Sequence, residues 1–161
     1  MLLRPRQKDF VERSLVVLKA NGNALGIAPT GAGKTILFSE IIGQYIKGTE
    51  AKTLVLAHRD ELTEQNQTKF SWVNPSIETS VYNSKTKDWS GQVTFAMVQT
   101  LFASDNISSM PKIDLLVIDE AHHAAANSYR TVINHALALN PSCIIFGVTA
   151  TPNRSDGKGL R

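Results

Sequence analysis

Hydrophobic and polar positions follow two kinds of pattern along this chain. Several segments place an apolar residue every three to four positions, which predicts amphipathic helices. These segments are 5–20, 35–46, 60–70 and 128–139. Other segments are short and almost continuously apolar, which is typical of parallel strands buried on both faces. They cover 24–27, 52–57, 93–97, 113–118 and 144–148. Segment 77–82 alternates more, so we expect a strand nearer the edge of the sheet.

The alternation of strands and helices predicts an α/β fold with a mostly parallel central sheet and helices on both faces. A chain of 161 residues is long enough to bury the core of one domain. Its composition of 42% hydrophobic and 19% charged residues is ordinary for a globular protein. No apolar stretch has the length of a membrane span. We therefore expect a soluble, cytoplasmic protein.

Charge and cysteine content restrict the possible class of protein only slightly. A formal charge of +3 is too small to indicate a nucleic-acid partner by itself. The one cysteine, Cys143, excludes an intrachain disulfide framework. Because it begins the apolar run that leads into 144–148, we expect Cys143 to be a buried strand residue.

Segment 28–35, Ala-Pro-Thr-Gly-Ala-Gly-Lys-Thr, lies between a predicted strand and a predicted helix. A glycine-containing loop at such a turn lets backbone N–H groups surround phosphate oxygens, and the helix N-terminus adds its positive dipole end. Lys34 would reach the β- and γ-phosphates, and the Thr35 hydroxyl would bind Mg²⁺. The usual pattern begins with glycine, whereas this chain has Ala28. The predicted ATP-binding residues of the loop are Thr30, Gly31, Ala32, Gly33, Lys34 and Thr35.

Asp119 and Glu120 follow the predicted strand 113–118 directly. Ligand sites of open α/β sheets lie at the carboxyl ends of strands. An aspartate there can hold Mg²⁺ through water, and an adjacent glutamate can polarise an attacking water. With Lys34, these two carboxylates are the predicted catalytic residues. The alternative is a solvated loop or a pair of helix-capping acids.

Motifs in a fixed order resemble the first RecA-like domain of superfamily 2 helicases, the group that contains the DEAD- and DEAH-box proteins. They are the glutamine motif (3–7), motif I (28–35), motif Ia (54–62), motif Ib or Ic (98–101), motif II, spelled DEAH (119–122), and motif III (149–152). Residues 153–160 are similar to the branch named for the Res subunit of type III restriction enzymes, which also includes RadD-like and phage helicases. The resemblance implies a RecA-like P-loop NTPase fold with ATP and Mg²⁺.

The resemblance also assigns Gln7 to adenine, since an amide donates and accepts hydrogen bonds at once. The alternative for Gln7 is an ordinary polar residue in a first helical turn. For Arg4 we include ATP binding, while ribose, phosphate and plain solvation stay open.

Nucleic-acid backbone contacts are implied for Arg59, Gln99 and Thr100, without base reading. A solvated arginine in a helix-starting turn, and a plain strand-to-helix cap, are the respective alternatives. For the basic loop 83–91 we favour a solvated loop anchored by Trp89 over a single-strand grip.

His122, Thr149 and Thr151 match the positions that couple the γ-phosphate site to motif III in the family. A capped turn before Pro152 is the alternative for the two threonines, and both interpretations can hold together. We interpret His123 as structural.

The predicted organisation is a RecA-like domain over 1–152 and a flexible segment over 153–161. The resemblance implies a second RecA-like domain in cis, which supplies an arginine for phosphoryl transfer. We expect the 161-residue chain alone to bind Mg·ATP but barely to turn it over. The motor would move along nucleic acid, DNA rather than RNA. The alternatives are a non-catalytic docking module and the motor of a restriction-type nuclease complex; a small-molecule kinase is disfavoured because no acceptor pocket or basic lid is evident.

Overall fold

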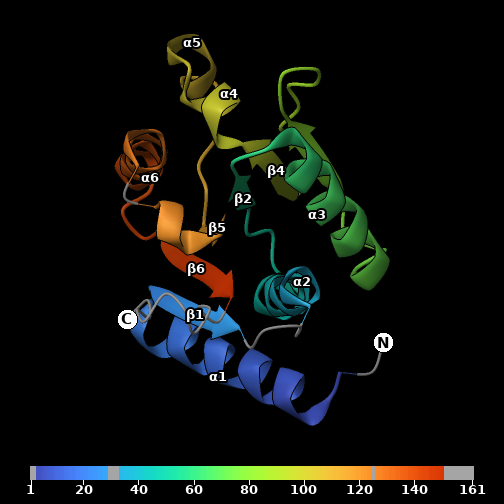
Figure 1. Ribbon diagram of the computed structural model, residues 1–161. Helices are drawn as coiled ribbons and strands as arrows, with labels where there is room; N and C mark the ends of the chain where they lie inside the picture. The colour runs from blue at the N-terminus through green and yellow to red at the C-terminus, as the bar shows by residue number, and fades with distance from the viewer. Residues whose placement is uncertain (1–2, 29–32, 125, 151–161) are drawn as a thin grey trace, which may run out of the picture.

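The computed structural model describes residues 3–28, 33–124 and 126–150, which form alternating helices and strands (Figure 1). The order is α1 (Pro5–Asn21), β1 (Ala24–Ala28), α2 (Lys34–Ile46), β2 (Thr53–Ala57), α3 (Asp60–Val73), β3 (Thr79–Tyr82), β4 (Val93–Met97), α4 (Val98–Phe102), α5 (Ser104–Ile107), β5 (Leu115–Asp119), a 3-10 turn η1 (Ala121–His123), α6 (Asn127–Leu139) and β6 (Ile144–Ala150). The predicted helices and strands are confirmed, with ends that shift by up to three residues.

The strands form one six-stranded sheet in the order β1-β6-β5-β2-β4-β3. Every pair of neighbouring strands is parallel, so the predicted α/β class is confirmed. β3 lies at an edge of the sheet, as its alternating pattern predicts. β6 lies between β1 and β5, and this order brings the strands that precede motifs I, II and III side by side.

Two apolar cores lie on the two faces of the sheet. On one face, side chains of α1, α2 and α3 pack against residues such as Val55 and Val117. On the other face, α4 and α6 cover the alternate positions, such as Leu54 and Leu116. Figure 1 shows α2 and α6 on opposite sides of the sheet. Since neighbouring residues of a strand face opposite ways, burial on both faces explains the almost continuous apolar runs.

Three short elements, α4, α5 and η1, are absent from the pattern-based prediction because three to five residues are too few to show a helical period. Cys143 is buried, with 4% of its surface exposed, but it lies just before β6 and not within it. Its predicted burial is confirmed and its predicted place in a strand is wrong by one residue.

Candidate nucleotide site

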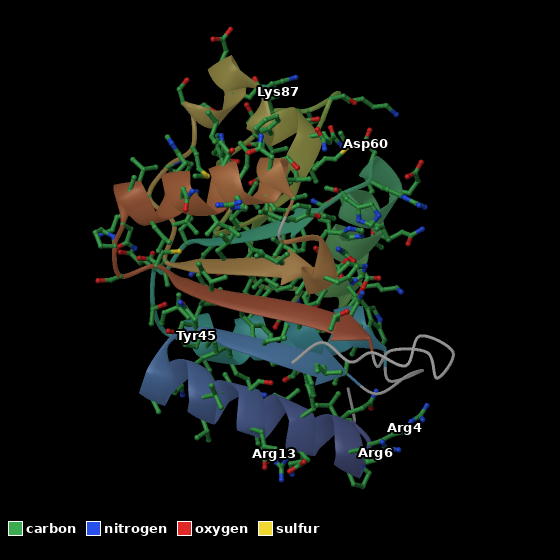
Figure 2. The ribbon with its side chains drawn as sticks, turned by 60° about the vertical axis from the view of Figure 1, so that its left-hand side comes forward. Arg4, Arg6, Arg13, Tyr45, Asp60 and Lys87 are labelled. Carbon is green, nitrogen blue, oxygen red and sulfur yellow. The ribbon has the colours of Figure 1, made fainter. Side chains whose placement is uncertain are left out.

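The predicted catalytic residues meet at the carboxyl edge of the sheet. Because all strands point the same way, β1, β5 and β6 end at this edge together. Figure 2 shows the strand arrowheads on one side, with Arg4, Arg6 and Asp60 at that side and Tyr45 at the opposite end. Lys34 begins α2 and Asp119 ends β5, so both lie at this edge.

Lys34 forms ion pairs with both motif II carboxylates. Its Nζ lies 2.9 Å from Asp119 Oδ1 and 2.9 Å from Glu120 Oε2. The Asp119 side chain is only 3% exposed, so Lys34 neutralises a buried charge. Burial by itself would lower the pKa of Lys34, but the attraction of Asp119 and Glu120 outweighs burial and raises it. The three predicted catalytic side chains therefore form one charged cluster.

Two residues in or next to this cluster have left-handed backbone. Gly33, which precedes α2, has φ = 71°, a conformation that glycine adopts without steric cost. Glu120 has φ = 58° and is the one non-glycine residue with positive φ in the described part of the chain. Such a conformation is strained for glutamate and is typical of functional sites. The turn separates Glu120 from the strand and lets its carboxylate reach Lys34.

The predicted Mg²⁺ ligands, Thr35 and Asp119, are bridged by a residue that sequence reasoning missed. Asn66 on α3 accepts a hydrogen bond from Thr35 Oγ1 at 3.1 Å and donates one to Asp119 Oδ2 at 3.0 Å. A hydroxyl and a carboxylate are oxygen ligands of the kind that Mg²⁺ prefers, so this pair fits the ion. The partners of Asn66 lie 31 and 53 positions away in the sequence, and no local pattern signals the contact.

His122 contacts motif III through Thr149. The distance from His122 Nδ1 to Thr149 Oγ1 is 3.3 Å, and the same nitrogen lies 3.8 Å from Glu120 Oε1. The structure thus brings together two of the three predicted coupling residues. Thr151 lies outside the described residues.

A second feature that the sequence did not reveal is a row of three histidine rings. The ring of His123 lies 4.2 Å from that of His122 and 4.5 Å from that of His58, measured between centroids. His58 directly precedes Arg59, so this row joins motif II to motif Ia. Burial lowers the pKa of His123, and the nearby His122 and His58 lower it further.

Gln7 lies next to the phosphate-loop end. A methyl group placed on Gly33 would lie 3.9 Å from Gln7 Nε2. Its Oε1 accepts a hydrogen bond from the Arg4 backbone N–H at 2.9 Å, which is a helix-capping contact. Gln7 therefore caps the first turn of α1 through its Oε1. Thr30, Gly31 and Ala32 lie outside the described residues.

The predicted nucleic-acid residues lie after β2 and β4. Arg59 is exposed and precedes α3, whereas Gln99 and Thr100 lie in α4. Gln99 Nε2 is 3.5 Å from Ser128 Oγ, and the Thr100 carbonyl accepts a bond from Asn106.

In the loop 83–91, the Trp89 indole N–H donates a hydrogen bond to Ser109, and its ring packs against Tyr82, with ring centroids 4.9 Å apart. The anchoring interpretation of Trp89 is confirmed.

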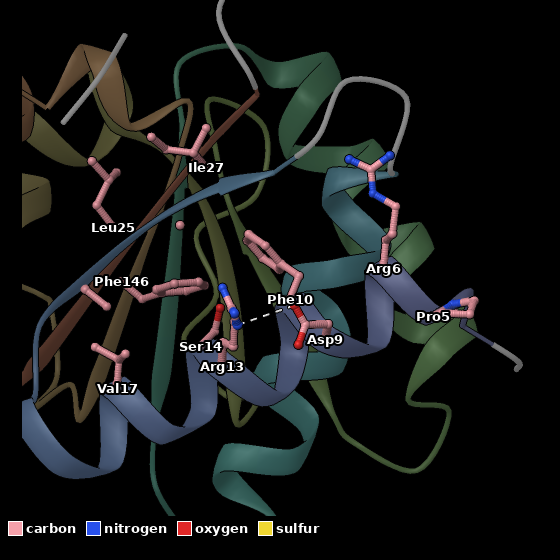
Figure 3. A pocket seen from close by; sticks show the side chains of 12 residues that line it. Pro5, Arg6, Asp9, Phe10, Arg13, Ser14, Val17, Leu25, Ile27 and Phe146 are labelled. Atoms are coloured by element: carbon pink, nitrogen blue, oxygen red, sulfur yellow. Dashed lines mark ion pairs between the residues drawn. The ribbon is translucent and has the colours of Figure 1, made fainter.

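A groove of about 600 Å³ lies between α1 and β1, away from the charged cluster (Figure 3). Phe10 and Phe146 form its floor, and Arg13 pairs with Asp9 at its rim. The groove begins at Pro5 and Arg6, in the helical turn that also carries Gln7. It is mainly apolar and holds none of the predicted catalytic residues.

Within the described residues, no helix has both the length and the apolar character that crossing a membrane requires.

The sheet order and the charged cluster define a RecA-like nucleotide-binding domain. Residues 1–154 match the family described as "Type III restriction enzyme, res subunit", and the chain belongs to this family. The predicted resemblance to the first RecA-like domain of superfamily 2 helicases is thereby confirmed.

Curated relatives are named as helicases. The chain is 32% identical over 172 residues to a protein of Saccharomyces cerevisiae provisionally named as the ATP-dependent helicase IRC3. It is 30% identical over 171 residues to the ATP-dependent DNA helicase MPH1 of Candida albicans. Both alignments cover 99% of this chain but only 25% and 14% of the relatives, so the chain spans a quarter or less of their length.

Solved structures share the fold at low sequence identity. The UvsW helicase of bacteriophage T4 matches with a TM-score of 0.73 and 22% identity, over 98% of this chain and 55% of that one. The Sulfolobus solfataricus SWI2/SNF2 ATPase core in complex with double-stranded DNA matches with a TM-score of 0.75 and 19% identity, over 97% and 34%. These likenesses support the α/β fold.

Proposed function

We propose that this chain is the Mg·ATP-binding half of an ATP-driven nucleic-acid motor. The observation that carries the proposal is the cluster of Lys34, Asp119 and Glu120 at the carboxyl edge of the sheet. Lys34 would exchange its carboxylate partners for the β- and γ-phosphates. Thr35 and Asp119 would hold Mg²⁺, which neutralises phosphate charge when it is bound. Glu120, freed from Lys34, would polarise the attacking water.

The remaining ATP contacts belong to the same proposal. Backbone N–H groups of 30–33 would surround the phosphates, and Gln7 Nε2 would donate to adenine while Oε1 keeps its capping bond. The contact between His122 and Thr149 would pass the state of the γ-phosphate to motif III and Thr151.

The proposed track is the nucleic-acid backbone, DNA rather than RNA, held by Arg59 and the α4 residues Gln99 and Thr100. The DNA helicase in the name of one relative and the double-stranded DNA in one matching structure support this choice. A second RecA-like domain in a longer protein would supply the arginine that phosphoryl transfer needs. Without that arginine, we expect turnover to be lower by on the order of 10³–10⁵. We place the boundary of the first domain at residue 152.

The test measures two things on this chain: binding of a fluorescent ATP analogue with Mg²⁺, and phosphate release with and without single- or double-stranded DNA and RNA. We expect binding that Lys34→Ala abolishes, together with almost no turnover. Robust turnover would contradict the half-motor proposal. An absence of nucleotide binding would leave only the family resemblance and would indicate that the adenine site needs the second domain.

Residue roles are separable once a longer protein with turnover is available. Glu120→Gln should keep ATP bound and stop hydrolysis. Arg59→Ala should weaken nucleic-acid stimulation and spare basal hydrolysis, and an equal loss of both would make Arg59 structural.

The family name and a matching Type ISP restriction-modification enzyme favour one further assignment, the motor of a restriction-type nuclease complex. DNA cleavage that requires ATP in the longer protein would test it.

The proposal includes an intracellular location. Cytoplasm is our prediction from composition, although one fission-yeast relative is named as mitochondrial. Cell fractionation separates the two.

A further inference from the structure

We infer that Asn66 is a positioning residue that holds both proposed Mg²⁺ ligands, Thr35 and Asp119, in their binding orientation. The inference rests on the proposed function, because it assigns Asn66 a role toward the metal of the Mg·ATP complex. No motif includes Asn66, and its role follows from its contacts alone.

Asn66 lies on the face of α3 that packs toward the sheet, and only 2% of its surface is exposed. Its Oδ1 accepts a bond from Thr35 Oγ1 at 3.1 Å, and its Nδ2 donates to Asp119 Oδ2 at 3.0 Å. One rigid amide therefore joins the start of α2 to the end of β5. Both ligands are fixed before any metal arrives, which lowers the entropy cost of binding it.

The two bonds orient the ligand atoms in a chemically useful way. A hydroxyl that binds a cation through a lone pair must direct its O–H elsewhere, and the Thr35 hydroxyl donates its hydrogen bond to Asn66 Oδ1. On Asp119, the amide N–H occupies Oδ2 and leaves Oδ1 for Lys34, which lies 2.9 Å away. Exchange of Lys34 for Mg²⁺ then needs no rotation of the carboxylate.

An amide suits this position because it carries a donor and an acceptor in one plane. A hydrophobic side chain would leave Asp119 Oδ2 and the Thr35 hydroxyl without these partners. Groups that orient metal ligands in this way typically contribute roughly 10–100-fold to metal affinity.

The experiment uses Mn²⁺ as the metal probe and fluorescent ADP as the nucleotide probe, on the 161-residue chain. Electron paramagnetic resonance measures Mn²⁺ binding in the presence of ADP, and fluorescence measures ADP binding with and without metal. Asn66→Ala should weaken Mn²⁺ binding by roughly 10–100-fold. Metal-free ADP binding should change little. Gln67→Ala is the matched control, because Gln67 is a neighbouring amide that donates instead to Thr79 Oγ1 at 3.0 Å.

A double-mutant cycle with Thr35→Val separates positioning from general damage. If Asn66 acts through the ligands, Asn66→Ala should weaken Mn²⁺ binding less in the Thr35→Val background, where only its bond to Asp119 is left to lose. Circular dichroism checks that each variant is folded, and Asn66→Ser replaces Asn66→Ala if the alanine variant is not. A serine hydroxyl is too short to bridge both ligands, so the same loss is expected.

The outcomes distinguish a failure of the Asn66 role from a failure of the proposed function. Metal-dependent ADP binding that Asn66→Ala and Asn66→Ser leave intact would overturn the role of Asn66 alone. An equal loss of metal-free and metal-bound ADP affinity would also overturn it, since that pattern indicates a structural role. If the unchanged chain binds no ADP with metal, the proposed function and this inference fall together.

Discussion

Lys34 Nζ lies 2.9 Å from Asp119 Oδ1, and this contact joins the phosphate-loop lysine to the acid of motif II. Lys34 thus neutralises the carboxylates where phosphate and metal are proposed to bind. Under the proposed function, nucleotide binding would be an exchange of partners, in which Lys34 turns to phosphate and Asp119 to Mg²⁺. The free protein avoids an uncompensated buried carboxylate in this way.

This exchange predicts that metal and nucleotide bind cooperatively. Nucleotide alone would withdraw Lys34 and leave Asp119 and Glu120 unpaired, so Mg²⁺ should strengthen nucleotide binding by about 5–150-fold. Fluorescent ADP titrated with Mg²⁺ or with a chelator measures this ratio. Asp119→Asn should reduce it, and equal affinity with and without Mg²⁺ in the unchanged chain would contradict the exchange.

Lys34 also predicts a pH dependence of stability. A lysine whose pKa is raised in the folded state contributes fully below its ordinary value of 10.5 and loses its contribution as pH rises through the folded-state pKa. Lys34→Met should lower the free energy of unfolding by about 3 kcal/mol at neutral pH, because a buried charge loses its partner. Urea unfolding should show this difference shrinking above pH 10.5.

The double variant Lys34→Met with Asp119→Asn is the control for that measurement. Removal of both charges should restore much of the lost stability. If the double variant is as unstable as Lys34→Met alone, loss of packing and not an unpaired carboxylate explains the effect.

The histidine row predicts a loss of stability in acid. The pKa of His123 is lowered in the folded protein, so the unfolded chain binds its proton more readily. Stability should therefore fall as pH drops below the ordinary histidine value of 6.5. His123→Phe should flatten this part of the urea-midpoint profile. Identical acid slopes in the unchanged chain and His123→Phe would contradict the prediction.

Cys143 should be unreactive in the folded protein. Burial raises the pKa of its thiol to about 11, and the thiolate is the reactive form. Alkylation followed by mass spectrometry should be slow at neutral pH and should accelerate only where urea unfolds the chain. Fast labelling of the folded protein would show that the segment before β6 opens.

Gly91 should resist substitution for a steric reason. A methyl group there would lie 2.4 Å from the Thr79 carbonyl carbon and 2.7 Å from the Ser80 nitrogen, which are backbone atoms that cannot turn aside. Gly91→Ala should lower the free energy of unfolding by about 1–3 kcal/mol. The neighbouring exposed Ser90→Ala should change it little, and equal stability of both variants would contradict the steric argument.

Sequence reasoning recovered the parts of this protein that local patterns encode. Periodicity gave the long helices and buried strands, and the strand-end positions of two motifs indicated Lys34, Asp119 and Glu120. The resemblance to superfamily 2 helicases linked His122 to Thr149. The structure adds their geometry, in particular the ion pairs of Lys34 and the strained turn at Glu120.

The contacts that the sequence could not predict join residues that are distant along the chain. Asn66 reads as an ordinary helix residue until strand order places it beside α2 and β5. The contact between the rings of His58 and His123 arises because β2 and β5 are parallel neighbours. For Gln7 the sequence left adenine binding and an ordinary place in a first helical turn open, and the structure adds the bond that its Oε1 accepts from the Arg4 backbone N–H.

The all-parallel sheet has a practical consequence for protein engineering. With every strand running the same way, the chemistry gathers at one rim and the turns at the other rim are free of it. The turn 47–50 at that opposite rim is exposed. A dye or a fused reporter attached there should leave nucleotide binding unchanged, and this turn is the natural place to tether the protein for single-molecule work.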